Sequence, residues 1–240
     1  MTPLLGISSM APRLVLAELA EAYTARSGCP VRFAAGGGVE VAQRVRSGER
    51  FDVVVLASDA IEQLMASGHV MPGGRVDLLC SGVAVAVRAG QAHPDLSTEA
   101  SVRAAVLAAD RVGYSTGPSG RALTDLFARW GIAERMAGRL VCAAPGEPVA
   151  SLVADGRVAL GFQQRSELIH ADGIEVVGDL PPAIQIVTTF SAGICAGTAR
   201  AAAVREMLAF MNSPDAVAAK QRQGMGPAVP GIAHSRSQTL

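Results

Sequence analysis

The 240-residue sequence is poor in lysine, in aromatic residues and in net charge, and each deficit excludes a class of function. Its only lysine is Lys220, so the glycine-rich phosphate loop that ends in a lysine is absent. Aromatic residues form 4% of the chain and are too scattered for the base-stacking platforms of single-stranded nucleic-acid binders. Because 21 basic residues balance 21 acidic ones, no basic surplus indicates a nucleic-acid partner. These deficits indicate a small-molecule partner.

Long apolar runs, clustered histidines and paired cysteines are also missing. No apolar run is long enough to span a membrane, and the first residues carry neither the basic segment nor the apolar stretch of a signal peptide. The sequence as given therefore predicts a cytoplasmic protein without membrane insertion, or a periplasmic one if it is a processed mature form. Because the four cysteines are widely spaced and the four histidines scattered, we expect buried free thiols, no metal site and no cofactor.

The sequence alternates between short apolar segments, which we expect to be strands, and segments whose apolar residues recur with the period of a helix. The strands that begin at Leu4, Pro30 and Asp52 each lead into small or hydroxyl residues and then into a helix. After its aspartate the third strand is continuously apolar, which is typical of a strand buried on both faces of a parallel sheet. This order predicts an α/β lobe with a mostly parallel sheet, and Ser8 or Ser9 is expected to cap the first helix.

A second alternation of helices and strands, from residue 102 to residue 177, is bracketed by two long β segments at 76–87 and 184–196. A chain with this pattern crosses to a second lobe and returns. The predicted division is therefore a first part of lobe 1, lobe 2, the return to lobe 1 with the C-terminal helices, and a tail, at residues 1–80, 81–188, 189–227 and 228–240.

Hydroxyls, glycines and an arginine gather at one strand-to-helix junction, residues 114–121. The amides of a first helical turn have no intrahelical partner, and the helix dipole is positive there, so the junction is suited to an anion. The alternative is an ordinary capped turn with a solvated arginine. A nucleophilic serine of the hydrolase type is excluded, because the flanking glycine pattern and the order of histidine and acid do not fit. The candidate anion-binding residues are Ser115, Thr116, Gly117, Ser119, Gly120 and Arg121.

Four segments together resemble the molybdate-binding, periplasmic type II solute-binding proteins: Ile7-Ser8-Ser9, the turn at 35–38, the strand end at 56–59 and the segment 208–214. The resemblance extends from about residue 4 to residue 227. It implies an α/β fold of two lobes, each a mostly parallel sheet flanked by helices, joined by a two-strand hinge and closing over a small anion. A transporter is implied as a partner only if the chain is exported. The further binding residues that the resemblance implies are Ser8, Ser9, Gly36, Gly37, Gly38 and Gln163.

Two departures from the family pattern bear on the ligand. Glu147 brings a carboxylate close to the expected site, where it would repel a dianion. Phe162-Gln163-Gln164 stands where molybdate binders commonly place a tyrosine. The ligand is therefore left open between a tetrahedral oxyanion such as molybdate and an organic carboxylate.

An enzyme is the alternative to a binding protein. Arg121 as a carboxylate clamp and Glu147 as a base are the groups that proton abstraction beside a carboxylate needs, although both also have ordinary surface interpretations. Aconitate isomerase resembles this family, which implies a cofactor-free isomerase of an unsaturated di- or tricarboxylic acid. A third interpretation is a cytosolic ligand-sensing module.

Overall fold

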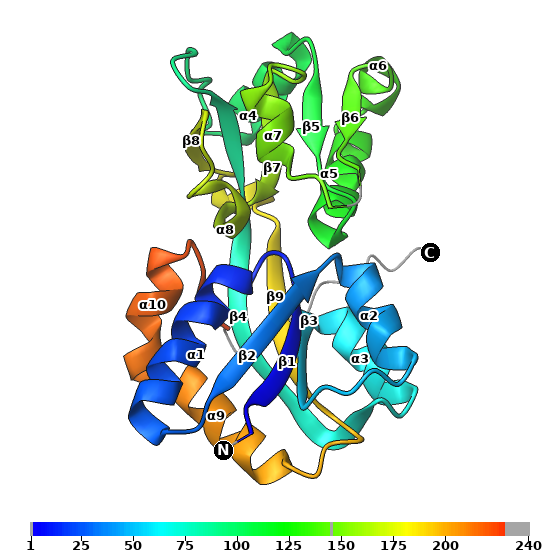
Figure 1. Ribbon diagram of the computed structural model, residues 1–240. Helices are drawn as coiled ribbons and strands as arrows, with labels where there is room; N and C mark the ends of the chain where they lie inside the picture. Colours follow the sequence, from blue (N-terminus) through cyan, green and yellow to red (C-terminus); the bar gives the residue numbers. More distant parts are fainter. Residues whose placement is uncertain (1, 145, 229–240) are drawn as a thin grey trace.

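The chain forms two α/β lobes, stacked one above the other and joined by two long strands, β4 and β9, in a computed structural model that describes residues 2–144 and 146–228 (Figure 1). Apart from its first residue, the expected tail at 228–240 lies outside the described residues. In the described part of the chain, no helix combines the length and the apolarity needed to cross a bilayer.

Lobe 1 contains residues from both ends of the chain. Its sheet has the order β2-β1-β3-β9-β4, in which β2, β1 and β3 run parallel and β9 and β4 are antiparallel to their neighbours. Its elements are β1 (Leu4–Ser9), α1 (Arg13–Ser27), β2 (Val31–Gly36), α2 (Gly38–Arg46), β3 (Val53–Ala57), α3 (Ser58–Ala66), β4 (Val70–Arg88), β9 (Val187–Cys195), α9 (Ala201–Met211), a 3-10 turn (Pro214–Ala216), α10 (Val217–Arg222) and β10 (Gly226–Pro227).

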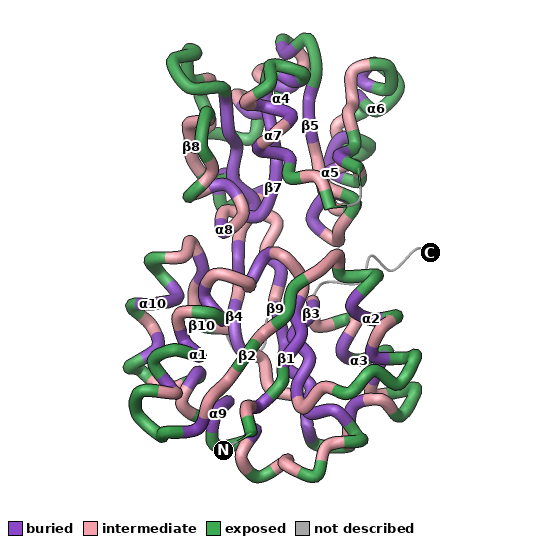
Figure 2. The backbone as a smooth tube through the Cα atoms, in the orientation of Figure 1, coloured by how far each residue is buried: buried purple, intermediate pink, exposed green. Residues whose placement is uncertain are grey.

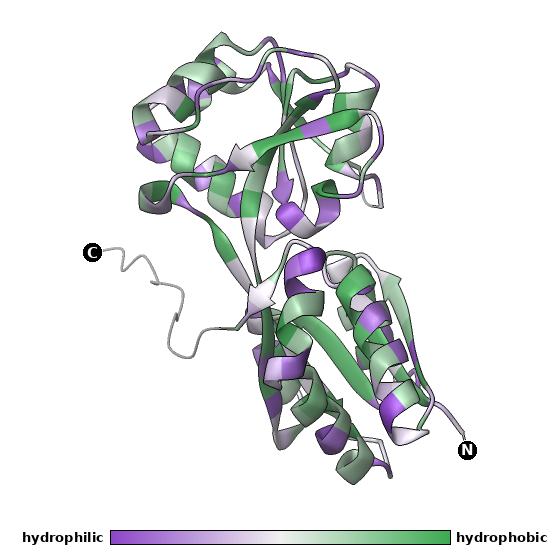
Figure 3. Cartoon of the chain, turned by 90° about the vertical axis from the view of Figure 1, so that its left-hand side faces the viewer, coloured by the Kyte–Doolittle hydropathy of each residue, from purple (hydrophilic) through white to green (hydrophobic). Residues whose placement is uncertain are grey.

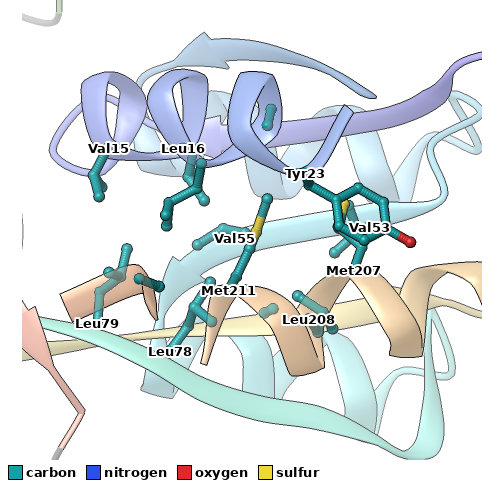
Figure 4. Packing of buried hydrophobic residues seen from close by; sticks show 14 of the residues in the cluster. Val15, Leu16, Tyr23, Val53, Val55, Leu78, Leu79, Met207, Leu208 and Met211 are labelled. Atoms are coloured by element: carbon teal, nitrogen blue, oxygen red, sulfur yellow. The ribbon is translucent and has the colours of Figure 1, made fainter. Parts of the chain in front are cut away.

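Helices cover both faces of the lobe 1 sheet because β3, its middle strand, is apolar at every position. Val53 and Val55 of β3 pack with α1 and α9, whereas Val54 and Leu56 pack with α2 and α3. Figure 4 shows the first of these two cores, with Leu16 of α1 among its labelled side chains. The strands of the lobe interior are buried in Figure 2 and mainly hydrophobic in Figure 3. The apolar run predicted to be a doubly covered strand is therefore one.

Lobe 2 repeats this plan with its own elements. Strands β6, β5 and β7 run parallel, and β4 and β8 add antiparallel pairs. Helices α4 and α5 pack on one face of the sheet, and α7 and α8 on the other. Its elements are α4 (Glu99–Ala108), β5 (Val112–Tyr114), α5 (Pro118–Arg129), α6 (Ala133–Met136), β6 (Leu140–Cys142), α7 (Val149–Ala154), β7 (Leu160–Gln164), α8 (Arg165–Leu168), β8 (Ile174–Asp179) and a 3-10 turn (Pro182–Ile184).

The two crossing strands belong to both lobes. Leu79 of β4 lies in the lobe 1 core and Val83 in the lobe 2 core, so the strand passes from one sheet to the other between them. Gly82 lies within β4, and a Cβ there would lie 2.8 Å from Nε2 of Gln185, so the Gln185 side chain would have to shift. The expected lobe boundaries at residues 80 and 188 lie within β4 and β9.

Two details differ from the sequence-based expectations. Ser8 and Ser9 were expected to cap the first helix, but both belong to β1, and α1 begins after Pro12 without a side-chain cap. Helix α5 begins at Pro118, several residues before the apolar run at Leu123. In both cases small polar residues that favour turns belong to a strand or a helix instead, because their tertiary contacts outweigh the turn preference.

The only lysine is buried inside lobe 1. Nζ of Lys220 on α10 donates to the Leu78 carbonyl of β4 over 2.8 Å and to Oδ1 of Asn212 over 3.4 Å. Burial lowers the pKa of Lys220 to about 8. The side chain therefore fastens the C-terminal helix to the strand that crosses between the lobes.

All four cysteines are free thiols. Cys29 and Cys195 are buried as expected, and burial raises the pKa of Cys195 to about 12. The expectation of a buried thiol is wrong for Cys142, which is exposed because β6 is the edge strand of the lobe 2 sheet.

Candidate anion site between the lobes

The carboxyl ends of the parallel strands in the two lobes meet at the hinge. At the end of β3 in lobe 1, Ala57 pairs with Phe190 of β9, and Phe190 pairs with Leu79 of β4. At the end of β7 in lobe 2, Gln164 pairs with Val83, only four residues further along β4. Ligands of open α/β sheets bind at the carboxyl ends of the strands. The helix starts of both lobes therefore bracket one region.

The two serines after the first strand have different surroundings. Ser8 is fully buried, and its hydroxyl donates to the carbonyl of Ser9 over 3.0 Å. Oγ of Ser9 is buried and has no hydrogen-bond partner among the described residues. Gly38 lies beside it, because a Cβ on Gly38 would be 3.9 Å from Cβ of Ser9. Ser9 is therefore the serine with free hydrogen-bonding capacity at the start of α2.

The glycine turn before α2 already holds a carboxylate. The Gly37 amide donates to Oε2 of Glu40 over 3.4 Å, and a Cβ on Gly36 would lie 3.1 Å from the same oxygen. Glu40 thus places negative charge where the sequence predicted an anion. A ligand that uses the Gly37 amide has to displace this exposed side chain.

In lobe 2 the start of α5 is shaped by close backbone packing. A Cβ on Gly120 would lie 1.7 Å from the Ser115 carbonyl oxygen, so only glycine permits the helix to press against this loop. The hydroxyls of Ser115 and Ser119 lie 3.4 Å apart, and no side chain caps the helix at Gly117. Two hydroxyls and uncapped amides at one helix start form a cluster that can hold an oxyanion.

The remaining predicted residues of lobe 2 are more exposed. Thr116 and Arg121 lie at the surface at the start of α5. Glu147 is ion-paired with Arg157 instead of Arg121, and it also accepts from the Ala144 amide over 3.3 Å. The Arg157 hydrogen bond holds the pKa of Glu147 below its usual range. A carboxylate held in this way is a weaker base than a free one, and its catalytic role stays a prediction.

Gln163 brings in two residues that the sequence reasoning missed, Glu167 and Arg13. Its Oε1 accepts from the Val149 amide at the start of α7 over 3.0 Å, and its Nε2 donates to Oε1 of Glu167 over 2.8 Å. Burial raises the pKa of Glu167 to about 7, and the charge of Arg13 on α1 of lobe 1 acts in the opposite direction. A basic side chain of lobe 1 therefore acts electrostatically on an acidic side chain of lobe 2. Nη1 of Arg13 itself donates to the Met10 carbonyl over 3.4 Å.

The signal for both residues was present in the sequence. Glu167 lies four residues after Gln163, which had already been predicted to bind the ligand, but it has the pattern of an ordinary acidic first-turn residue. Arg13 is likewise the first residue of α1, directly after the Ser8-Ser9 segment. Both residues are half-buried, and the action of Arg13 on Glu167 depends on the meeting of two lobes, which no local pattern reports.

Several buried polar side-chain atoms of the described residues have no hydrogen-bond partner. Besides Ser9, the described part of the chain has such atoms at Oε1 of Gln164, Oγ of Ser166 and Oγ of Ser213. The Gln164 amide nitrogen donates to Oγ1 of Thr188 on β9 over 2.7 Å, which fixes this side chain at the hinge. Buried polar atoms normally have partners, so Ser9, Gln164 and Ser166 have capacity for a polar ligand. Within the described residues, no group of three or more histidine, cysteine, aspartate or glutamate side chains is placed to hold a metal ion.

Comparisons with known proteins agree with this architecture. The family model described as bacterial extracellular solute-binding protein matches residues 4–226. An aconitate isomerase of Pseudomonas sp is 33% identical over 241 residues, which cover 94% of this chain and 92% of that protein. The periplasmic molybdate-binding protein of Azotobacter vinelandii superposes with a TM-score of 0.77 at 24% identity, covering 95% of this chain and 99% of that one. The sulfate-binding protein SubI of Mycobacterium tuberculosis superposes with a TM-score of 0.76 at 15% identity, covering 96% and 88%. The chain belongs to the bacterial extracellular solute-binding protein family, with the two-lobed type II fold of its molybdate-binding members.

Proposed function

We propose that this protein binds a small di- or tricarboxylic acid between its two lobes. The observations that carry the proposal are the charge of Arg13 in lobe 1, which acts on Glu167 of lobe 2, and the unpartnered buried polar atoms of Ser9 and Gln164 at the ends of β1 and β7. An arginine binds a carboxylate through two parallel hydrogen bonds. Glu40 and ionised Glu167 repel any fully ionised anion, so the preference for a carboxylate rests on the planar fork of the Arg13 guanidinium.

The ligand class is tested by calorimetry and thermal shift with two sets of anions. Molybdate, tungstate and sulfate form one set, and citrate, cis-aconitate and trans-aconitate form the other. We expect binding in the second set, with Arg13→Gln weakening it at least tenfold through the lost charged hydrogen bonds. Arg135→Gln is the matched control, because Arg135 is an exposed arginine of lobe 2 on α6. Stabilisation by the oxyanions but not by the carboxylates would contradict the proposal.

A second candidate function is isomerisation of the bound acid by transfer of an allylic proton, without a cofactor. It is favoured by the aconitate isomerase that is 33% identical over 94% of the chain. Because cis- and trans-aconitate differ in ultraviolet absorbance, their interconversion is followed directly. Binding of either acid without interconversion would leave a binding protein and exclude the isomerase. Delivery of the ligand to a membrane transporter remains a prediction that pull-down with a candidate permease would test.

A further inference from the structure

We infer that Glu167 is the residue that moves the proton on the carboxylic acid bound between the lobes, an inference that rests on the isomerase candidate above. The proton transfer is thereby assigned to a residue other than Glu147, the base predicted from the sequence. The position of Glu167, the groups that hold it and the charges that face it support this assignment.

The position of Glu167 places a carboxyl group at the edge where the two lobes meet. The side chain lies on α8, which begins directly after β7 ends at Gln164, beside the hinge. Unpartnered buried oxygens lie at Gln164 and Ser166, within three residues on the same chain segment. Figure 1 shows α8 at the end of lobe 2 that faces lobe 1.

The carboxyl group is held but not neutralised. Gln163 donates one hydrogen bond to Oε1 of Glu167 over 2.8 Å and is itself fixed by the Val149 amide. A positioning amide of this kind sets the direction of the carboxyl group without supplying a counter-charge. Glu147 has the opposite environment, because the guanidinium of Arg157 pairs with it directly.

Arg13 is the charge that acts on Glu167. The other charged groups near α8 have partners of their own: Arg165 pairs with Asp179 of β8, and Arg222 pairs with Glu18 of α1. His170 is hydrogen-bonded to Gln223. Helix α7 and strand β7, which pack against α8, contain no charged residue. Strands β4 and β8 also pack against α8, and their charged residues are Arg75, Asp77, Arg88, Glu175 and Asp179. Arg75 pairs with Asp77, and Glu175 pairs with His93. Arg13 is therefore placed to bind a substrate carboxylate beside Glu167 and to stabilise the negative charge that develops on it.

Burial tunes this carboxyl group for proton transfer near neutral pH. The pKa of Glu167 is raised to about 7, so the group is close to half-ionised at neutral pH and can both take up and return a proton. A catalytic acid or base is most effective when its pKa lies near the working pH.

The reaction balances with this residue alone. The Glu167 carboxylate removes a proton from the methylene carbon of the allylic unit, and the electron pair of that C–H bond forms the new double bond. The π electrons of the old double bond take the proton back from Glu167 at the other end of the unit. No atom is gained or lost, no oxidation occurs, and Glu167 returns to its starting state.

The test uses the full chain with trans-aconitate in deuterium oxide. Binding is measured by calorimetry, and isomerisation and deuterium incorporation are measured by NMR, for the wild type, Glu167→Gln, Glu147→Gln and the exposed lobe 2 control Glu134→Gln. We expect Glu167→Gln to bind the acid and to lose about 10²–10⁴-fold in both rates, whereas Glu134→Gln is unchanged. The wild-type rate should rise with an apparent pKa near 7 that disappears in the residual activity of Glu167→Gln.

The outcomes separate the inference from the proposed function. If no carboxylate binds the wild type, the proposed function fails and the inference fails with it. If the acid binds but neither isomerises nor exchanges deuterium, the binding proposal stands and the role of Glu167 is overturned. That role is also overturned if Glu147→Gln abolishes exchange while Glu167→Gln retains it. Circular dichroism and an unchanged melting curve for Glu167→Gln exclude misfolding as the cause of a lost rate.

Discussion

The Gln163 amide nitrogen donates to the Glu167 carboxylate over 2.8 Å, while the amide oxygen of the same side chain caps the start of α7. The hydrogen bond favours the ionised form of Glu167, so it opposes the upward effect of burial on the pKa. Gln163 thus orients the carboxyl group, while burial and the charge of Arg13 also act on its protonation.

Removal of this hydrogen bond has a defined effect on the titration of Glu167. In Gln163→Leu we expect the pKa of Glu167 to rise above about 7, because the ionised form loses its donor while burial persists. Carbon-13 NMR of the glutamate carboxyl groups measures the shift, with the exposed Gln91→Leu as the control. The uncapped Val149 amide should also lower the free energy of unfolding by about 1–3 kcal/mol. An unchanged or lowered pKa would contradict the arrangement described for this pair.

Glu167 makes stability depend on pH with a predictable sign. Because its pKa is raised from 4.5 to about 7, the folded protein retains a proton that the unfolded chain releases. This contribution is fully present below pH 4.5 and is lost as the pH rises through 7. Urea unfolding at pH 4.5 and pH 8 should show a fall that is larger in the wild type than in Glu167→Gln by roughly 2–3 kcal/mol. Identical pH dependence in the two proteins would show that Glu167 titrates normally.

Substitution of Gly120 tests whether the close packing at the start of α5 shapes the lobe 2 half of the site. Gly120→Ala places a Cβ 1.7 Å from the Ser115 carbonyl oxygen, so the loop or the helix has to move. We expect a loss of about 1–3 kcal/mol in the free energy of unfolding, together with weaker ligand binding. The control is Gly138→Ala, because a Cβ there meets no atom within 4 Å. Equal behaviour of the two variants would mean that this close approach does not exist in solution.

Substitution of Glu40 tests whether the start of α2 contributes to anion binding. Its carboxylate accepts from the Gly37 amide and repels a second anion there. Glu40→Gln should therefore strengthen binding of an anionic ligand by about twofold to fivefold at low salt. Glu21→Gln, on the exposed side of α1, makes the same charge change away from the site and should leave the affinity unchanged. If both variants strengthen binding equally, the effect comes from net charge alone.

Lys220 makes the free energy of unfolding depend on pH with the opposite sign to Glu167, and at higher pH. Its pKa is lowered from 10.5 to about 8, so below pH 8 the folded protein holds a buried charge that the unfolded chain holds in water. This penalty is relieved as the pH rises from 8 to 10.5, and the wild type should gain roughly 1–3 kcal/mol relative to Lys220→Met over that interval. Parallel curves from denaturant titrations would contradict the lowered pKa.

The sequence was sufficient for the lobes because their strands and helices are locally consistent. The apolar run at 53–57 has no solvent-facing position, and it forms a strand covered on both faces. The C-terminal helices expected on the return to lobe 1 are present as α9 and α10. The start of α5 was harder to predict from the sequence. Ser119 and Gly120 are typical turn residues, and the packing of Gly120 against the Ser115 carbonyl is what places them in the helix.

The location of the candidate site could be predicted from the sequence, but the pairing of its charged side chains could not. The strand ends that carry Ser9 and Gln163 follow from the order of the elements, since parallel strands end at a common edge. The pairing of Glu147 with Arg157 and the capture of the Gly37 amide by Glu40 depend on side-chain geometry within a few ångströms. The electrostatic effect of Arg13 on Glu167 depends on how the two lobes meet, which is a long-range property of the whole chain.

The burial of Lys220 has a practical consequence for labelling the protein. As the sequence contains no other lysine, reagents that attack side-chain amines find no target on the folded surface of lobe 1 or lobe 2. Cys142, in contrast, offers an exposed thiol at the edge of lobe 2. A single fluorophore placed there by thiol chemistry, paired with a second one introduced on lobe 1, would report the distance between the lobes as ligand is added.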